Sequence, residues 1–252
     1  MSRNSSLQAL VLSVRPFGED NRIVKFLSKE KGIFDAVLYG GPKSKLRAYV
    51  SPYHFGNLWI YTDETKHSIK ITDFEVIKYH PEIRENLFKT WCASFCSELV
   101  IKTDACGEYE KIWTLANGFL DGISVSSEDE CRIAFLRFIW RYIGIMGLQC
   151  DTESCLHCGE NLTNSKGKIY FSILENGFIC ENCFNPSNDS FFELSSEAII
   201  FLQAVTLLSP KESRSIPLHF STTQQLHEFL TFLINRYTGC KLKTLEMSSG
   251  IL

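Results

Sequence analysis

The chain of 252 residues is 44% hydrophobic and carries a formal net charge of −3, and it is long enough for two domains and a further small module. It contains no secretory signal at its N-terminus and no run of about 18 apolar residues, so neither export nor a membrane span is expected. Charge is divided unevenly, because residues 1–80 carry a net charge of +4 and the rest of the chain carries −7. This asymmetry predicts that the N-terminal third binds a polyanion.

Residues 1–80 are predicted to form an OB-fold β-barrel. Short runs rich in β-branched and aromatic residues alternate there with polar or glycine-bearing links, which is typical of strands joined by turns. Five such runs match the strand count of an OB-fold. The predicted strands are Leu7–Val14, Arg22–Leu27, Ile33–Tyr39, Phe55–Tyr61 and Ser68–Ile77.

The link after the third predicted strand begins with two glycines and continues with three cations at alternate positions. In an extended link these cations would project to one side, toward a line of phosphates. We therefore predict a DNA-binding surface here, with an ordinary solvated basic loop as the alternative. The predicted DNA-binding residues are Lys43, Lys45 and Arg47, together with Arg15, Arg22 and Lys25 on the neighbouring strands.

Two aromatic residues beside turns, Phe17 and Tyr49, are the candidates for stacking against nucleic-acid bases. Stacking of this kind contributes roughly 1–3 kcal/mol per base. Most other aromatic residues nearby alternate with polar residues, which favours burial in the barrel core.

After His80 the hydrophobic period changes to that of helices, and residues 81–150 and 191–252 are predicted to form one α-helical domain. Proline suits the first turn of a helix, Ser-x-x-Glu and Thr-x-x-Gln are capping-box patterns, and glycine favours the C-terminal cap. The predicted helices therefore begin at Pro81, Tyr109, Ser127, Ser195 and Thr222, and the last one ends at Gly239.

Three arginines of the third predicted helix, Arg132, Arg137 and Arg141, lie among large aromatic residues. They are candidates for binding an acidic peptide whose hydrophobic end enters the helical domain. The alternative is that their aliphatic stems pack along the helix and their charges face solvent.

Two CxxC pairs predict a zinc ribbon in residues 151–190, inserted between helices of the helical domain. The 21 residues between the pairs read as a hairpin with the turn dipeptide Asn176-Gly177, which would bring the pairs together. Four thiolates suit tetrahedral Zn²⁺ and close its coordination shell, so we predict one structural zinc ion that braces the helical domain. The predicted ligands are Cys155, Cys158, Cys180 and Cys183.

The remaining polar residues suggest neither a fifth ligand nor catalysis. His157, inside the first pair, is predicted to point outward because four cysteines already suffice. The other six cysteines form no disulfide-like framework, which favours the reducing cytoplasm. No Walker A loop, GxGxxG, GxSxG or HExxH pattern is present, so we predict a protein that is not an enzyme and has no small-molecule substrate.

Three segments together give the chain a family resemblance. Arg15-Pro16-Phe17-Gly18-Glu19-Asp20-Asn21-Arg22-Ile23-Val24, Lys31-Gly32-Ile33-Phe34 and the basic link from Gly40 to Arg47 are similar to the bacterial recombination mediator family RecO. The order of barrel, helical domain and interposed CxxC…CxxC module also resembles that family over nearly the whole chain.

The resemblance implies an α+β multidomain protein of the bacterial cytoplasm, associated with the nucleoid. It implies binding of single- and double-stranded DNA and annealing of complementary strands. It further implies that RecR is a partner in loading RecA onto strands coated with single-strand-binding protein (SSB), whose acidic C-terminal tail is an expected partner. Two alternatives stay open from the residues: a zinc-ribbon adaptor that binds RNA or a polymerase, and a zinc hydrolase, which a closed shell of four cysteines opposes.

Overall fold

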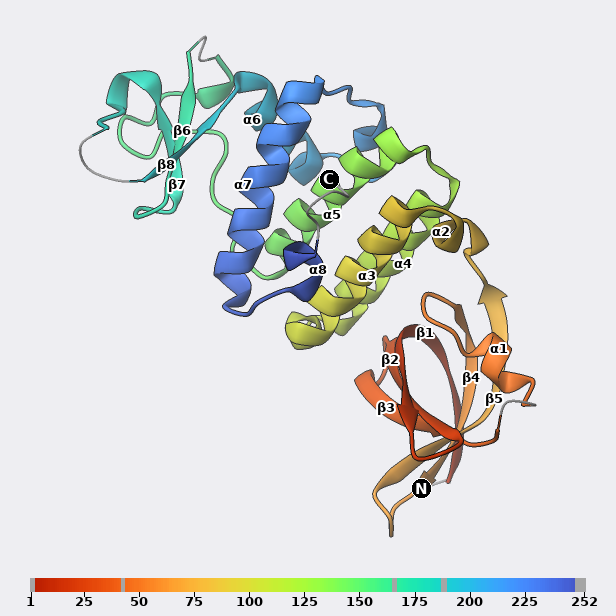
Figure 1. Ribbon diagram of the computed structural model, residues 1–252. Coiled ribbons are helices and arrows are strands. Elements are labelled where there is room, and N and C mark those ends of the chain that lie inside the picture. The colour runs from red at the N-terminus through yellow and green to blue at the C-terminus, as the bar shows by residue number, and fades with distance from the viewer. Residues whose placement is uncertain (1–2, 42–43, 165–166, 187–189, 248–252) are drawn as a thin grey trace. The chain divides into compact units, whose positions relative to one another are not determined.

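The computed structural model describes residues 3–41, 44–164, 167–186 and 190–247, which are organised in two compact units (Figure 1). The first unit comprises Met1–Glu128 and Cys240–Leu252, and the second comprises Asp129–Gly239. Residues 81–128 thus pack with the barrel. The predicted boundaries of three domains stay a prediction, because packing alone does not test them.

The N-terminal part of the first unit is a closed five-stranded barrel, as predicted. Its strands follow the order β1-β2-β3-β5-β4, and β4 returns to pair with β1. All neighbours are antiparallel except β3 and β5, which share the one parallel pair Val37–Lys70. The strands are β1 (Asn4–Phe17), β2 (Asn21–Ser28), β3 (Gly32–Leu38), β4 (Phe55–Asp63) and β5 (Ser68–Lys78).

Alternation along the strands separates the barrel interior from its outer face. Val24 and Phe26 of β2 belong to the interior core with Phe34 and Phe74, and the ring centres of Phe26 and Phe34 lie 5.6 Å apart. Part of the outer face is buried as well, including Leu27, because helices of the first unit contact β1 and β2. The barrel wall is therefore packed on both sides there, while other parts of its outer face stay exposed.

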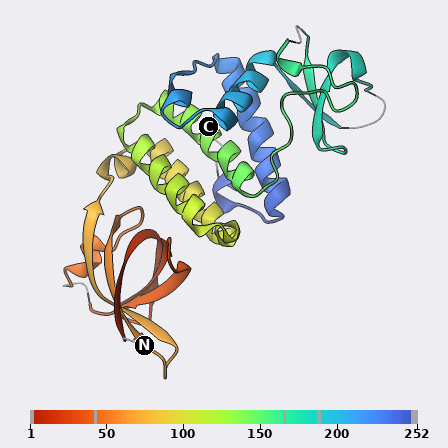
Figure 2. The same cartoon turned by 180° about the vertical axis from the view of Figure 1, so that it is seen from behind.

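Among the described residues of the first unit, five helices accompany the barrel, and α3 and α4 lie side by side in both views (Figures 1 and 2). The predicted first helix divides at Asn86, whose extended backbone ends α2 and whose side chain accepts the Lys89 N–H to cap α3. The helices are α1 (Leu46–Tyr49), α2 (Pro81–Glu85), α3 (Leu87–Lys102), α4 (Tyr109–Val125) and α8 (Lys243–Glu246), with a 3₁₀ turn η1 (Asp104–Gly107).

The barrel meets α4 at a glycine. Gly32 has a φ of +68°, and a Cβ on it would lie 2.7 Å from the ring of Tyr109. The ring therefore lies directly over the backbone at the start of β3, a close approach that only glycine permits. This requirement accounts for the glycine at position 32.

The last described residues return to α3. Both oxygens of the Glu98 carboxylate accept backbone N–H groups of Lys243 and Thr244, and Trp91 Nε1 donates to the Thr244 carbonyl at 2.7 Å. The carboxylate thus satisfies donors at the beginning of α8 that no helical carbonyl can reach. Residues of the chain's C-terminal end thereby complete the first unit.

The second unit combines helices with a small sheet. Ser195 caps α6, as predicted, by accepting the Ala198 N–H, and Gly239 ends α7 in the left-handed conformation. Its elements are α5 (Glu128–Ile145), η2 (Leu162–Asn164), β6 (Ile169–Ser172), β7 (Gly177–Cys180), η3 (Glu181–Cys183), β8 (Phe191–Leu194), α6 (Ser196–Leu207), η4 (Glu212–Ser215) and α7 (Phe220–Thr238).

The predicted capping box at Thr222 and Gln225 is wrong. Helix α7 begins two residues earlier, at Phe220. The Gln225 side chain instead accepts the N–H of Ser195 at 2.9 Å, and Thr222 donates its hydroxyl to Glu197. Contacts with the neighbouring helix α6 therefore replace the local pattern.

The helices of the described residues include none that is both long enough and apolar enough to span a membrane.

Candidate functional site

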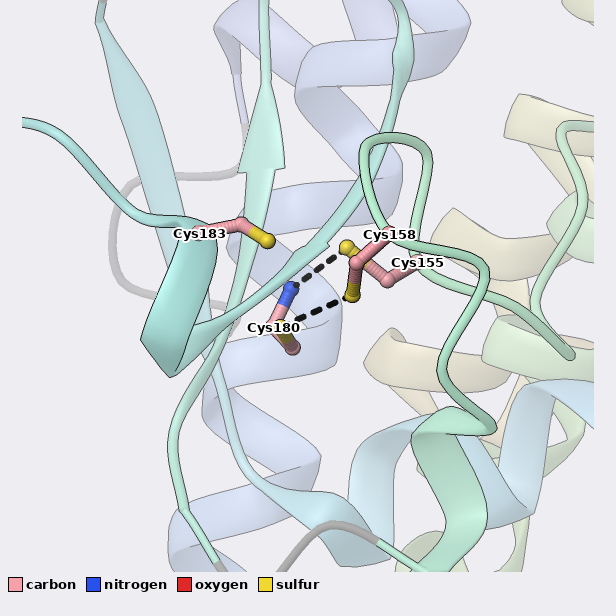
Figure 3. Close-up of side chains that lie close together, drawn as sticks. All are labelled: Cys155, Cys158, Cys180 and Cys183. Atoms are coloured by element: carbon pink, nitrogen blue, oxygen red, sulfur yellow. Dashed lines mark hydrogen bonds between the residues drawn. The ribbon is translucent and has the colours of Figure 1, made fainter.

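The four predicted metal ligands come together at one end of the small sheet of the second unit (Figure 3). Their Sγ atoms all lie within 4.8 Å of one another, and Cys158 and Cys180 approach to 3.7 Å. The first pair lies in the loop before the sheet, whereas Cys180 ends β7 and Cys183 ends η3. The cluster can hold a metal ion.

Backbone hydrogen bonds shape the first knuckle. The Cys155 N–H donates to the Glu160 carbonyl, and Gly159, at a φ of +72°, donates back to the Cys155 carbonyl. The Leu156 N–H donates to the Phe178 carbonyl at 2.8 Å, which attaches the knuckle to β7. The tight turn that CxxC requires is therefore fixed by the adjacent strand.

One cysteine of the cluster, Cys155, favours the thiolate even before any cation is considered, whereas burial raises the pKa of the Cys180 thiol and a hydrogen bond with Cys158 raises the pKa of the Cys183 thiol. Although burial acts to raise the pKa of the Cys155 thiol, the backbone N–H groups of Cys158, Cys180 and His157 lower that pKa to about 6. One of these donors is visible as a hydrogen bond from Cys180 N to Cys155 Sγ at 3.3 Å. A deprotonated sulfur with N–H support is the form of cysteine that binds metals.

His157 points away from the cluster, as predicted. Its Nε2 lies 2.8 Å from the Glu175 carboxylate, on the exposed surface of the hairpin. The metal site therefore consists of four sulfur atoms.

The sheet that carries the cluster is packed on α7. The strand order of the sheet is β7-β6-β8, so a third strand lies next to β6. No pattern in the sequence predicts this third strand. Phe229 of α7 lies against three phenylalanines of the sheet, with ring centres 5.0 Å from Phe171, 5.9 Å from Phe178 and 5.7 Å from Phe192.

Two polar contacts hold the hairpin to the same helix. Arg236 donates to the Ile173 carbonyl, and the Tyr237 hydroxyl donates to the Asn176 side chain at 2.6 Å. The metal cluster is thus connected through its sheet to a helix of the second unit.

The predicted DNA-binding residues do not lie on one surface. Arg15 and Lys25 share the outer face of β1 and β2, and both approach Asp35, at 3.8 and 2.7 Å. Arg22 belongs to the opposite face of β2, in alternation with Lys25, and its half-buried side chain lies on the interior side near the end of the strand.

The basic link is not extended where it is described. Lys45 has helical backbone angles and precedes α1, which contains Arg47. Lys45 is exposed, whereas Arg47 is half-buried with a buried Nε. The alternating arrangement of cations therefore does not hold at these two positions, and Lys43 lies outside the described residues.

The predicted arginines of α5 lie near a turn that follows α6. Arg137 donates to the Ser213 carbonyl at 3.1 Å, and Arg141 donates to the Leu208 carbonyl and the Ser213 hydroxyl. Burial, with the nearby charges of Arg141 and Arg214, lowers the pKa of Arg137 to about 10. The sequence did not point to Arg214, which lies in η4 near Arg137. The two residues are 77 positions apart, so no local pattern connects them.

Comparison with known proteins agrees with this architecture. Residues 1–80 match the family described as "Recombination protein O N terminal", and residues 84–246 match "Recombination protein O C terminal". The chain is 28% identical to "DNA repair protein RecO" of Bacillus pumilus, over 94% of this chain and 90% of the relative. It is 27% identical to the protein of that name from Bacillus subtilis, with 94% and 91% coverage, and 23% identical to that from Syntrophus aciditrophicus, with 97% and 95%. The chain therefore belongs to the RecO family of DNA repair proteins, which are non-enzymatic recombination mediators.

Proposed function

We propose that this protein binds single- and double-stranded DNA, anneals complementary strands and, with RecR, helps load RecA onto SSB-coated DNA in the bacterial cytoplasm. Family membership over both parts of the chain is the observation that carries the proposal. The five-stranded barrel supports it, because OB-type barrels bind oligonucleotides. The excess of cations in residues 1–80 supplies the positive charge that phosphates require.

Strand annealing tests this proposal. Complementary strands coated with SSB are expected to anneal faster with the protein than without it, and binding to single strands is expected to weaken with salt. If about five phosphates are neutralised, the slope of log affinity against log salt concentration is about −3.5. Replacing Arg15, Lys43 and Lys45 together with Gln is expected to make this slope less negative by about 2 units.

The matched control removes the same charge elsewhere, by replacing Lys111, Lys211 and Lys241 with Gln. If the salt dependence of binding weakens equally in this control, the barrel cations are not the residues that contact the phosphates. Tight RNA binding without DNA annealing would instead favour an RNA-binding adaptor.

We infer that the ion of the cysteine cluster is Zn²⁺ and that its role is structural. A tetrahedral zinc site with Zn–S bonds of about 2.3 Å has sulfur–sulfur distances of about 3.8 Å, close to the 3.7 Å between Cys158 and Cys180. Four sulfur ligands would leave no open position for a water molecule, which a catalytic zinc keeps. The protein's own part is to hold the four sulfur atoms within 4.8 Å of one another, where they would bind the ion.

We further propose that Arg132, Arg137 and Arg141 bind the acidic C-terminal tail of SSB. Among the described residues no carboxylate lies within ion-pair distance of the guanidinium groups of Arg137 and Arg141. Arg214 adds a third positive charge nearby, and the Glu130 carboxylate acts on Arg137 only from a longer distance. Leu207 and Leu208, beside the carbonyl that Arg141 contacts, expose apolar side chains. An acidic peptide with a hydrophobic end is complementary to both features.

A fluorescent peptide with the tail's chemistry tests this site. Arg214→Gln is expected to weaken its binding about fivefold or more, since a charge close to an acidic ligand is removed. Lys241→Gln, an exposed cation of the first unit, serves as the control and is expected to bind the peptide as the unmodified protein does. Equal affinity in both variants would place the peptide elsewhere.

A further inference from the structure

A row of side chains, alternately aromatic and cationic, crosses the outer face of the barrel. Lys70 of β5 pairs with Val37 of β3 on one side and with Tyr61 of β4 on the other. Tyr61 in turn pairs with Asn4 at the start of β1. Tyr39 lies two residues beyond Val37, just after β3, and Arg3 lies one residue before Asn4, just before β1. We call Tyr39, Lys70, Tyr61 and Arg3 the tyrosine–cation row.

Direct contacts join the members of the row. Lys70 Nζ lies 5.5 Å from the ring centre of Tyr39 and 5.9 Å from that of Tyr61, both within the range of a cation–π interaction. Arg3 Nη1 lies 3.5 Å from the Tyr61 hydroxyl. Among the described residues, neither Lys70 nor Arg3 has a carboxylate partner. The two rings are thus held in place while both positive charges stay available.

The aromatic surface continues along β4. Trp59 lies two residues before Tyr61 on the same face of the strand and is 37% exposed, and Tyr39 is 47% exposed. An open groove of about 480 Å³ lies beside Trp59 and is lined by the polar residues Asn4, Ser5, Ser6 and Thr72 and by Ile60. Hydroxyl and amide groups next to an exposed indole suit a planar, polar ligand such as a nucleic-acid base.

Two carboxylates flank the row, so its local charge is small. Asp73 pairs with Trp59 across the strands, and Asp63 lies two residues beyond Tyr61. Each accepts a nearby backbone N–H, from Phe74 and Lys66 respectively. Phosphate attraction is therefore weak here, and ring stacking is the larger source of affinity.

We propose that the tyrosine–cation row and Trp59 form a platform on which bases of single-stranded DNA stack. This inference rests on the proposed DNA binding and says where unpaired bases lie. Bases in a duplex stack on each other and hide their faces, so the platform selects single strands. Lys70 and Arg3 lie between and beside the rings, where they contact the backbone that connects successive bases.

Replacing both tyrosines tests the platform. The Tyr39→Leu, Tyr61→Leu double variant is expected to bind single-stranded oligothymidine about tenfold more weakly or worse at every salt concentration. The slope of log affinity against log salt is expected to stay unchanged, because no charge is removed. Tyr79→Leu removes a similarly exposed tyrosine beyond the end of β5 and is expected to bind normally. Thermal melting of each variant verifies that the barrel is folded.

Tryptophan fluorescence reports the contact directly. Of the four tryptophans, Trp59 is exposed, whereas Trp91, Trp113 and Trp140 are at most 5% exposed. Single strands are therefore expected to quench the fluorescence, and Trp59→Phe is expected to abolish the change.

The outcomes separate the two proposals. Unchanged fluorescence and full affinity of the double variant, with salt-dependent binding by the unmodified protein, would overturn the platform and leave DNA binding intact. Absence of any binding to DNA by the unmodified protein would overturn the proposed function and the platform with it.

Discussion

Removal of the metal ion is expected to unfold the second unit while the barrel stays folded. Metal binding contributes roughly 10–16 kcal/mol in small zinc peptides, which matches or exceeds the total stability of about 5–15 kcal/mol that is typical of a domain. The sheet that carries the cysteines contributes Phe171, Phe178 and Phe192 to the contact with Phe229 of α7. Loss of the sheet therefore exposes an apolar face of that helix.

Hydrogen exchange followed by mass spectrometry distinguishes the two units. After treatment with a strong chelator, amides of α5, α6 and α7 are expected to exchange rapidly, whereas those of β1 to β5 stay protected. Cys158→Ser is expected to have the same effect without a chelator. Cys150→Ala changes a half-buried cysteine outside the cluster and serves as the control.

The bracing role is wrong if the metal-free protein keeps the protection of α7. If only β6, β7 and β8 lose protection, the metal stabilises the small sheet and does not brace the helices. Binding of single-stranded DNA to the barrel is expected to survive chelation in either case, because no predicted DNA-binding residue lies in the second unit.

The second large effect is expected from Gly56→Ala, which should disrupt the barrel and leave the metal site unchanged. A Cβ at this position would lie 2.1 Å from the carbonyl oxygen of Glu75 and 3.0 Å from the Cα of Val76. Both atoms belong to the backbone of β5, so no side chain can rotate away. The register between β4 and β5 shifts at this point, where the two strands approach closely.

Overpacking of this kind destabilises by about 3 kcal/mol or more, which lowers the melting temperature of the first unit by about 10 °C. Thermal melting followed by circular dichroism measures the effect, and the zinc content of the purified variant is expected to equal that of the unmodified protein. Gly118→Ala is the matched control, because this exposed glycine of α4 has no heavy atom within 4 Å of an added Cβ. It is expected to stabilise the protein by roughly 0.5–1 kcal/mol. Similar melting of the two variants would contradict the close approach at Gly56.

Local sequence patterns predicted those parts of the fold that local interactions determine. Short runs rich in β-branched and aromatic residues, separated by polar links, located the five barrel strands, and the spacing of two CxxC pairs located the metal cluster. The knuckle is formed by hydrogen bonds between residues close in sequence, so its geometry is encoded in a short segment. For the same reason the cap of Ser195 and the end of α7 at Gly239 were predictable.

Features that depend on distant residues were not predictable in this way. Gln225 was expected to cap its own helix, but it contacts Ser195, 30 positions away. Strand β8 is four residues long and exists through its pairing with β6. The tyrosine–cation row likewise follows from the register of four strands, which no single stretch of sequence reveals.

The return of Thr244 to Trp91 and Glu98 has a consequence for how the protein is made. The ribosome synthesises the barrel, α3 and α4 first, and the entire second unit follows before residues 240–247 appear. The second unit, with all four metal ligands, is therefore synthesised between the two parts of the first unit. The first unit, although started earlier, acquires its last contacts only after the second has been synthesised. The first unit therefore begins to be synthesised before the second, and it cannot be completed until residues 243 and 244 have been added.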